Sequence, residues 1–118
     1  MAKVLIVDDS AFLRMRNAAM VKDLGHDVIE AADGAQAVAA YKSDKPDAVL
    51  LDITMPGMDG LEALKEILAF DPAARVAMVT AMGQQSIVME ALKSGARDFV
   101  VKPFEPERVK LALTKLVA

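Results

Sequence analysis

The sequence contains no cysteine, and only 4% of its 118 residues are aromatic. Without cysteine the chain can form no disulfide framework, no thiol-based active site and no cysteine-based metal site. The N-terminus also lacks the basic flank followed by a long apolar run that marks a leader peptide. We therefore expect a cytoplasmic protein with no membrane partner.

Positive charge is also scarce, because 14 Lys and Arg residues stand against 17 Asp and Glu residues and leave a formal net charge of -3. Nucleic-acid binding relies on clustered basic residues, which some binders interleave with aromatic residues. Neither pattern occurs in this sequence. We expect no nucleic-acid binding, and we favour a partner that is a protein or a small anion together with a metal ion.

Apolar residues, in contrast, make up 54% of the chain, which is enough to form a core, and the length suits one domain over residues 1–118. Five short apolar runs alternate with five patterns of helical spacing. The runs cover residues 3–7, 27–30, 48–52, 76–80 and 99–103. This alternation is typical of βαβ units and predicts an α/β fold on a single doubly wound parallel sheet of five strands. Periodicity alone leaves the strand order open.

The central run, residues 48–52, ends in a carboxylate and is followed by a segment rich in Pro and Gly. An uninterrupted apolar run indicates a strand that helices cover on both faces. Asp52 is then expected at the carboxyl edge of the sheet, where open α/β sheets bind their ligands. The alternative is that Asp52 only caps the segment that follows.

Other chemically useful residues also follow predicted strands: Asp8 and Asp9 the first, Thr80 the fourth and Lys102 the fifth. If these strand ends are neighbours, three carboxylates crowd together and repel one another unless a cation intervenes. Mg²⁺ takes oxygen ligands, commonly one or two carboxylates with waters and phosphate oxygens, and suits this set.

The same residues are suited to phosphoryl transfer. Asp52 can act as the nucleophile, while the metal and Lys102 neutralise charge that develops in the transition state. Taken singly, each residue has a plain structural explanation. Asp9 or Ser10 could cap a helix, Thr80 could be an ordinary strand residue, and Lys102 could be solvated. The site would be absent only if all of these structural explanations held at the same time.

Four motifs together resemble the receiver domain of two-component response regulators, and the resemblance spans the whole chain. The motifs are Asp8-Asp9, the segment 52–60 (Asp-Ile-Thr-Met-Pro-Gly-Met-Asp-Gly), Thr80-Ala81 and Lys102-Pro103-Phe104. Nothing follows the last predicted helix, so the chain is most similar to stand-alone members. Residues 81–85 are similar to those of the chemotaxis type in particular. The resemblance implies a (βα)5 flavodoxin-like fold with strand order 2-1-3-4-5.

The resemblance also implies a role for each site residue. Asp52 would accept a phosphoryl group from a sensor histidine kinase, and Thr80 and Lys102 would bind the phosphoryl oxygens. The ligands of Mg²⁺ would be Asp8, Asp9, Asp52 and the backbone carbonyl of Thr54. Such a protein is not an enzyme acting on a separate substrate, because it catalyses only its own phosphorylation and dephosphorylation.

The output implied by the resemblance is altered binding to another protein, which in a chemotaxis setting is the flagellar switch. Phe99, three residues before Lys102, takes the position of an aromatic residue that moves together with Thr80. Tyr is frequent at that position in chemotaxis members, and Phe99 lacks its hydroxyl. Phe99 could instead be a core strand residue. We expect a monomer.

Two other phosphate-related classes fit less well. A flavin-binding module needs a phosphate cradle after its first strand, where Asp8 and Asp9 would repel the ligand. A phosphatase of the haloacid dehalogenase kind needs a second Asp two residues after its nucleophile, and this chain has Thr54 there. A single-domain phosphorelay or sporulation-type regulator outside chemotaxis remains an open alternative.

Overall fold

The computed structural model describes residues 2–55 and 57–117, so Pro56 of the central motif lies outside the described residues. The strands form one parallel sheet in the order β2-β1-β3-β4-β5. Their bounds are β1 Lys3–Val7, β2 Asp27–Ala31, β3 Ala48–Asp52, β4 Val76–Thr80 and β5 Asp98–Val101. The predicted fold class and strand order are confirmed.

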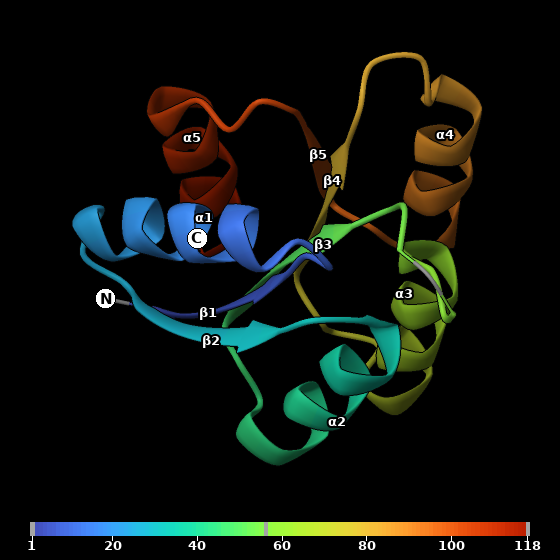
Figure 1. Cartoon of the computed structure of the whole chain (residues 1–118). Helices are drawn as coiled ribbons and strands as arrows, with labels where there is room; N and C mark the ends of the chain where they lie inside the picture. The colour runs from blue at the N-terminus through green and yellow to red at the C-terminus, as the bar shows by residue number, and fades with distance from the viewer. Residues whose placement is uncertain (1, 56, 118) are drawn as a thin grey trace.

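Helices cover both faces of this sheet (Figure 1). Two of them, α1 and α5, pack on one face, and the other three, α2, α3 and α4, pack on the opposite face. Their bounds are α1 Ala11–Asp23, α2 Gly34–Asp44, α3 Gly60–Phe70, α4 Gln85–Ser94 and α5 Pro106–Val117. The central strands β3 and β4 are therefore shielded from water on both sides, whereas the edge strands β2 and β5 are partly exposed.

Alternation along each strand divides the core into two clusters. In β1, Val4 and Ile6 join the cluster under α1 and α5, whereas Leu5 and Val7 join the cluster under α2, α3 and α4. Successive side chains of a strand point to opposite faces, so a strand that is apolar throughout supplies both clusters. All five residues of β3 are buried for this reason, and the last of them is Asp52.

Aspartate side chains cap the first turns of α2 and α3. Asp33 Oδ1 accepts a hydrogen bond from Gln36 N at 2.8 Å, and Asp59 Oδ1 accepts one from Glu62 N at 2.9 Å. Each carboxylate satisfies a backbone N–H that has no partner inside the first helical turn. The two caps therefore set the residues at which α2 and α3 begin, beside the carboxyl edge of the sheet.

The fifth strand, β5, ends at Val101, two residues before the end of the predicted run 99–103. Lys102 N still donates to Thr80 O at 2.7 Å, but Pro103 has no N–H with which to continue the pairing. The prediction that residues 102 and 103 belong to the strand is therefore wrong. The early end frees the side chain of Lys102 to turn toward the strand ends.

Gly60 allows the start of α3 to lie directly against the end of β3. A Cβ atom at this position would collide with the backbone of Asp52 and Ile53. Gly60 N instead donates to Ile53 O at 2.8 Å. The absence of a side chain at Gly60 thus permits the close approach that shields Asp52.

Candidate functional site

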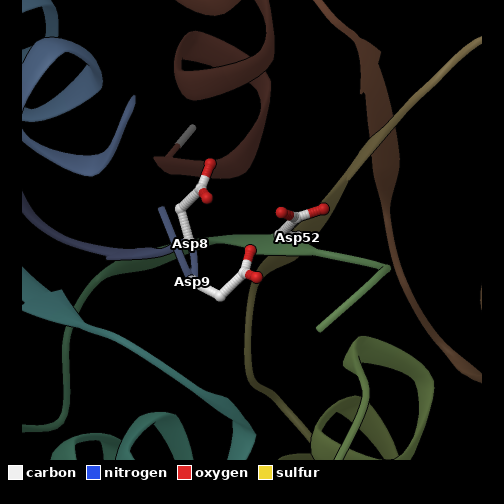
Figure 2. Close-up of side chains that lie close together, drawn as sticks. All are labelled: Asp8, Asp9 and Asp52. Atoms are coloured by element: carbon white, nitrogen blue, oxygen red, sulfur yellow. The ribbon is translucent and has the colours of Figure 1, made fainter. Parts of the chain in front are cut away.

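Three aspartates meet at the carboxyl ends of β1 and β3 (Figure 2). Asp8 and Asp9 directly follow β1, and Asp52 is the last residue of β3. One carboxylate oxygen from each lies within 4.8 Å of the others. Asp8 and Asp52 are buried, whereas Asp9 is exposed. The predicted gathering of these residues at one sheet edge is observed.

The turn into α1 orients Asp8. Asp8 Oδ1 accepts a hydrogen bond from Ser10 N at 2.9 Å, and its backbone carbonyl accepts one from Arg14 Nη1 at 2.8 Å. Ser10 is the residue that caps α1, with its hydroxyl accepting from Leu13 N at 3.2 Å. Because Ser10 fills the capping role, Asp9 remains available for another function.

Lys102 is directed at the aspartates from the loop after β5. Its Nζ lies 3.0 Å from Oδ2 of Asp52 and 3.8 Å from Oδ2 of Asp8. Only 30% of the Lys102 side chain is exposed, so the alternative of a simply solvated lysine is wrong. One ammonium group therefore faces two buried carboxylates with a third nearby.

The electrostatic balance at Asp52 favours an additional cation. Burial raises the pKa of the Asp52 carboxyl, and the charge of Asp8 raises it further. The hydrogen bond and charge of Lys102 lower this pKa but do not compensate fully, so it stays above its ordinary value. Three hard carboxylate oxygens with excess negative charge fit a divalent cation such as Mg²⁺, and the cluster could hold a metal ion.

Thr80 ends β4 beside this cluster and is only 2% exposed. Its hydroxyl lies 2.8 Å from Gln84 Oε1 and 3.0 Å from Ala81 O, both of which can accept its proton. Gln84 also contacts Thr54 Oγ1 through Nε2 at 2.8 Å. Gln84 is not among the predicted site residues, although it lies in the segment 81–85. A glutamine four residues after a strand-end threonine carries no strong signal by itself.

Phe99 lies on β5 with 36% of its surface exposed, so the alternative of a buried core residue is wrong. Its side chain and Thr80 border the same pocket of about 430 Å³. The other apolar residues of the pocket wall include Val88, Met89, Leu92 and Val101. This arrangement leaves room next to Thr80 into which an aromatic ring can move.

Residues 4–114 match the model of the response regulator receiver domain. The chain belongs to this family. The chain is 55% identical over 116 residues to the chemotaxis protein CheY of Listeria monocytogenes, covering 98% of both chains. It is 52% identical over 115 residues to the chemotaxis protein CheY of Thermotoga maritima, covering 97% of this chain and 96% of that one.

A solved structure of the receiver family is closely similar as well. A chain of the crystal structure of the CheX-CheY-BeF3-Mg²⁺ complex from Borrelia burgdorferi superimposes with a TM-score of 0.92 at 40% identity. The alignment covers 98% of this chain and 89% of that one. Together with the chemotaxis relatives, this similarity supports a phosphorylation-activated signalling switch of the chemotaxis type for this receiver domain.

Receiver domains act as signalling switches and not as classical enzymes, and they interact with histidine kinases and downstream targets. Among the helices of the described residues, none has the length and apolar character needed to cross a membrane. The role of each site residue stays a prediction. These residues are Asp8, Asp9, Asp52, Thr54, Thr80, Phe99 and Lys102.

Proposed function

We propose that this receiver domain, a single domain over residues 1–118, accepts a phosphoryl group on Asp52 from a sensor histidine kinase. It then signals in the cytoplasm through altered binding to a protein target. The observation that carries the proposal is the surroundings of Asp52. Its buried carboxylate lies 3.0 Å from Lys102 Nζ and shares a cluster with Asp8 and Asp9.

The transfer is a substitution at phosphorus. A carboxylate oxygen of Asp52 attacks the phosphorus of a phosphohistidine, a new O–P bond forms and the P–N bond breaks. The imidazole nitrogen keeps the electron pair and takes a proton from water. Lys102, already within contact distance of this carboxylate, offsets the negative charge on the phosphoryl oxygens.

Mg²⁺ would be held by the carboxylates of Asp8, Asp9 and Asp52 and by the backbone carbonyl of Thr54. When bound, it supplies positive charge to the phosphoryl oxygens. Asp8 is held for this role by the N–H of Ser10. The exposed position of Asp9 leaves one side of the cluster open to solvent, through which a phosphodonor can approach.

The phosphorylated state ends by hydrolysis within the same site. Water attacks the phosphorus, the O–P bond to Asp52 breaks, and the products are inorganic phosphate and the original carboxylate. No separate substrate is turned over. The protein is therefore a switch whose only chemistry is its own phosphorylation and dephosphorylation.

The output surface is formed by α4, β5 and α5. Thr80 moves toward the new phosphoryl oxygens, and Phe99 settles into the space beside it, which shifts a pre-existing equilibrium of this surface. The pocket shared by Thr80 and Phe99 supports this coupling. Exposed candidate contacts for the target are Gln85, Met89, Lys93, Val101, Glu107 and Lys110. In chemotaxis the target is the flagellar switch protein, bound by a monomer of this chain.

Mass spectrometry of the protein after incubation with Mg²⁺ and a small phosphodonor tests the proposal. We expect an acid-labile adduct of one phosphoryl group that maps to Asp52. The variant Asp52→Asn keeps the shape of the side chain but removes the nucleophile, and it should form no adduct. Wild-type rates of phosphate incorporation in Asp52→Asn would show that the acceptor is another residue.

A further inference from the structure

The side chain of Gln84 joins three points around the phosphorylation site. Its Oε1 accepts from Ala81 N at 2.8 Å and lies 2.8 Å from the hydroxyl of Thr80. Its Nε2 donates to the hydroxyl of Thr54 at 2.8 Å. One amide thus connects the segment after β4 with the segment after β3, close to Asp52.

The hydrogen-bond partners determine which way this amide faces. The N–H of Ala81 can only donate, so the atom beside it must be the oxygen of Gln84. Nε2 then faces Thr54 Oγ1, which can accept. Oε1 has a second lone pair for the hydroxyl of Thr80, so each of these three contacts pairs a donor with an acceptor.

Gln84 makes these bonds in place of the capping hydrogen bond that a residue at the start of a helix commonly makes. It occupies the N-cap position of α4, yet its side chain forms no capping hydrogen bond to that helix. The preceding Gly83 has φ +90, a left-handed conformation that reverses the chain just before Gln84. The loop therefore directs the amide back over Thr80 and away from the helix that it begins.

The hydroxyl of Thr80 has a single proton, and in the part of the chain that the structure describes its acceptors are Gln84 Oε1 and Ala81 O. A phosphoryl group on Asp52 needs that same proton. We propose that Gln84 is a latch, a positioning residue that holds the Thr80 hydroxyl in the resting orientation and must be displaced when the switch is activated. This inference rests on the proposed phosphorylation of Asp52.

Removing the latch makes activation easier. In Gln84→Ala, Thr80 keeps only the carbonyl of Ala81 as an acceptor, and the segment after β4 loses its tie to Thr54. A single neutral hydrogen bond contributes about 0.5–1.5 kcal/mol. The affinity for beryllofluoride, a phosphoryl mimic, should therefore rise about 2- to 10-fold in the presence of Mg²⁺.

A glutamate at the same position should act in the opposite direction. In Gln84→Glu the carboxylate still accepts from Ala81 N and Thr80, and it can accept from the hydroxyl of Thr54 as well. The latch is kept, and its added negative charge opposes an anion on Asp52. Beryllofluoride affinity should therefore fall below that of the wild type. General loosening of the loop would lower affinity in both variants, so opposite changes separate a latch from a merely structural role.

The experiment is a titration of the full chain with beryllofluoride and Mg²⁺, followed by the backbone amide signals of Thr80 and Ala81. Ser86→Ala, an exposed change in the first turn of α4, is the matched control and should bind like the wild type. In the free protein, Gln84→Ala should shift the Ala81 amide, because that N–H loses its acceptor. An unchanged Ala81 signal, or an affinity in Gln84→Ala at or below that of the wild type, would overturn the latch.

The variant Thr54→Val tests the latch independently if Gln84→Ala is poorly folded. Valine keeps the branched shape and the backbone carbonyl but removes the anchor for Nε2 of Gln84. Its beryllofluoride affinity should rise, and an unchanged value would contradict the latch. Wild-type protein that fails to bind beryllofluoride would instead contradict the proposed phosphorylation of Asp52. The Ala81 signal of the free protein would still test the Gln84 network in that case.

Discussion

Lys102 Nζ lies 3.0 Å from Oδ2 of Asp52, yet this contact does not bring the pKa of the Asp52 carboxyl down to its ordinary value. Burial raises that pKa more than the lysine lowers it. The native protein therefore binds a proton at Asp52 more tightly than the unfolded chain does. Stability falls as the pH rises from the unfolded pKa through the folded pKa, because the buried carboxylate becomes charged over that interval.

Replacing Asp52 by Asn should stabilise the metal-free protein at pH 7. The amide removes an incompletely compensated buried charge, and we expect a gain of about 1 kcal/mol, or roughly 4 °C in melting temperature. The gain should shrink at acid pH, where the wild-type carboxyl is protonated. Thermal melts of both proteins across pH measure this, with the exposed Glu66→Gln as the control. A melting temperature below that of the wild type at pH 7 would show that the pair with Lys102 outweighs the cost of burial.

Mg²⁺ should raise the melting temperature of the wild-type protein, because a ligand that binds only the folded state stabilises it by an amount that grows with the logarithm of the ligand concentration above the dissociation constant. Asp9→Asn should lose most of this gain. Asp9 is exposed, so the substitution should leave the metal-free melting temperature nearly unchanged. Glu66→Gln should keep the full gain. Equal responses of wild type and Asp9→Asn to a Mg²⁺ titration would remove Asp9 from the metal site.

Thr80→Ala should still accept a phosphoryl group but transmit the signal poorly. The nucleophile Asp52 and Lys102 remain, whereas the Thr80 hydroxyl, which moves toward the phosphoryl oxygens, is lost. Couplings of this kind change partner affinity by about 5- to 150-fold. Backbone amide shifts with and without beryllofluoride and Mg²⁺ should reach Phe99 and α4 in the wild type but stay near Asp52 in Thr80→Ala. Shifts that spread equally far in both proteins would exclude Thr80 from the coupling.

Arg108→Gln should destabilise the protein through Asp98, the first residue of β5. Burial raises the pKa of the Asp98 carboxyl, but hydrogen bonds from Arg108 and from the Phe99 backbone, with nearby positive charge, lower it below its ordinary value. Asp98 thus contributes stability above its unfolded pKa, and this stability is lost as the pH falls through the folded value. We expect a loss of about 1–2 kcal/mol at pH 7, limited because Arg108 is partly solvated.

Urea denaturation at neutral and acid pH checks the Arg108 prediction, and Lys115→Gln is the matched control. Lys115 lies 3.8 Å from the same carboxylate but is 67% exposed, so its removal should change stability by no more than about 0.5 kcal/mol. The effect of Arg108→Gln should diminish at acid pH. Arg108 Nη2 also donates to the backbone carbonyl of Phe99. A loss that is independent of pH would mean that Arg108 acts through packing or through this second hydrogen bond.

Most of the fold could be predicted because its signals are local. Each strand is a short apolar run, and the capping residues Asp33 and Asp59 sit three positions before their partners. The gathering of Asp8, Asp9 and Asp52 also follows from local patterns, because parallel strands bring their carboxyl ends to one edge of the sheet. Strand order came only from the family resemblance, since several orders bury the same apolar runs.

Two features could not be predicted, because they depend on contacts between segments distant in sequence. The exposure of Phe99 depends on how closely α4 packs beside β5. The amide of Gln84 meets Thr54 and Thr80 only after two loops have been brought together. A glutamine in the sequence gives no indication of which loop its amide will reach.

The sequence by itself determined the alternation of strands and helices, and with it the placement of acidic residues at strand ends, because periodicity and turn chemistry act over a few residues. Only the tertiary structure decided the balance of charge at Asp52. Its burial, its 3.0 Å contact with Lys102 and the nearby charge of Asp8 arise because packing brings the segments after β1 and β5 to the end of β3. The pKa of a carboxyl depends on the distance and solvation of its neighbours, and both quantities are set by packing.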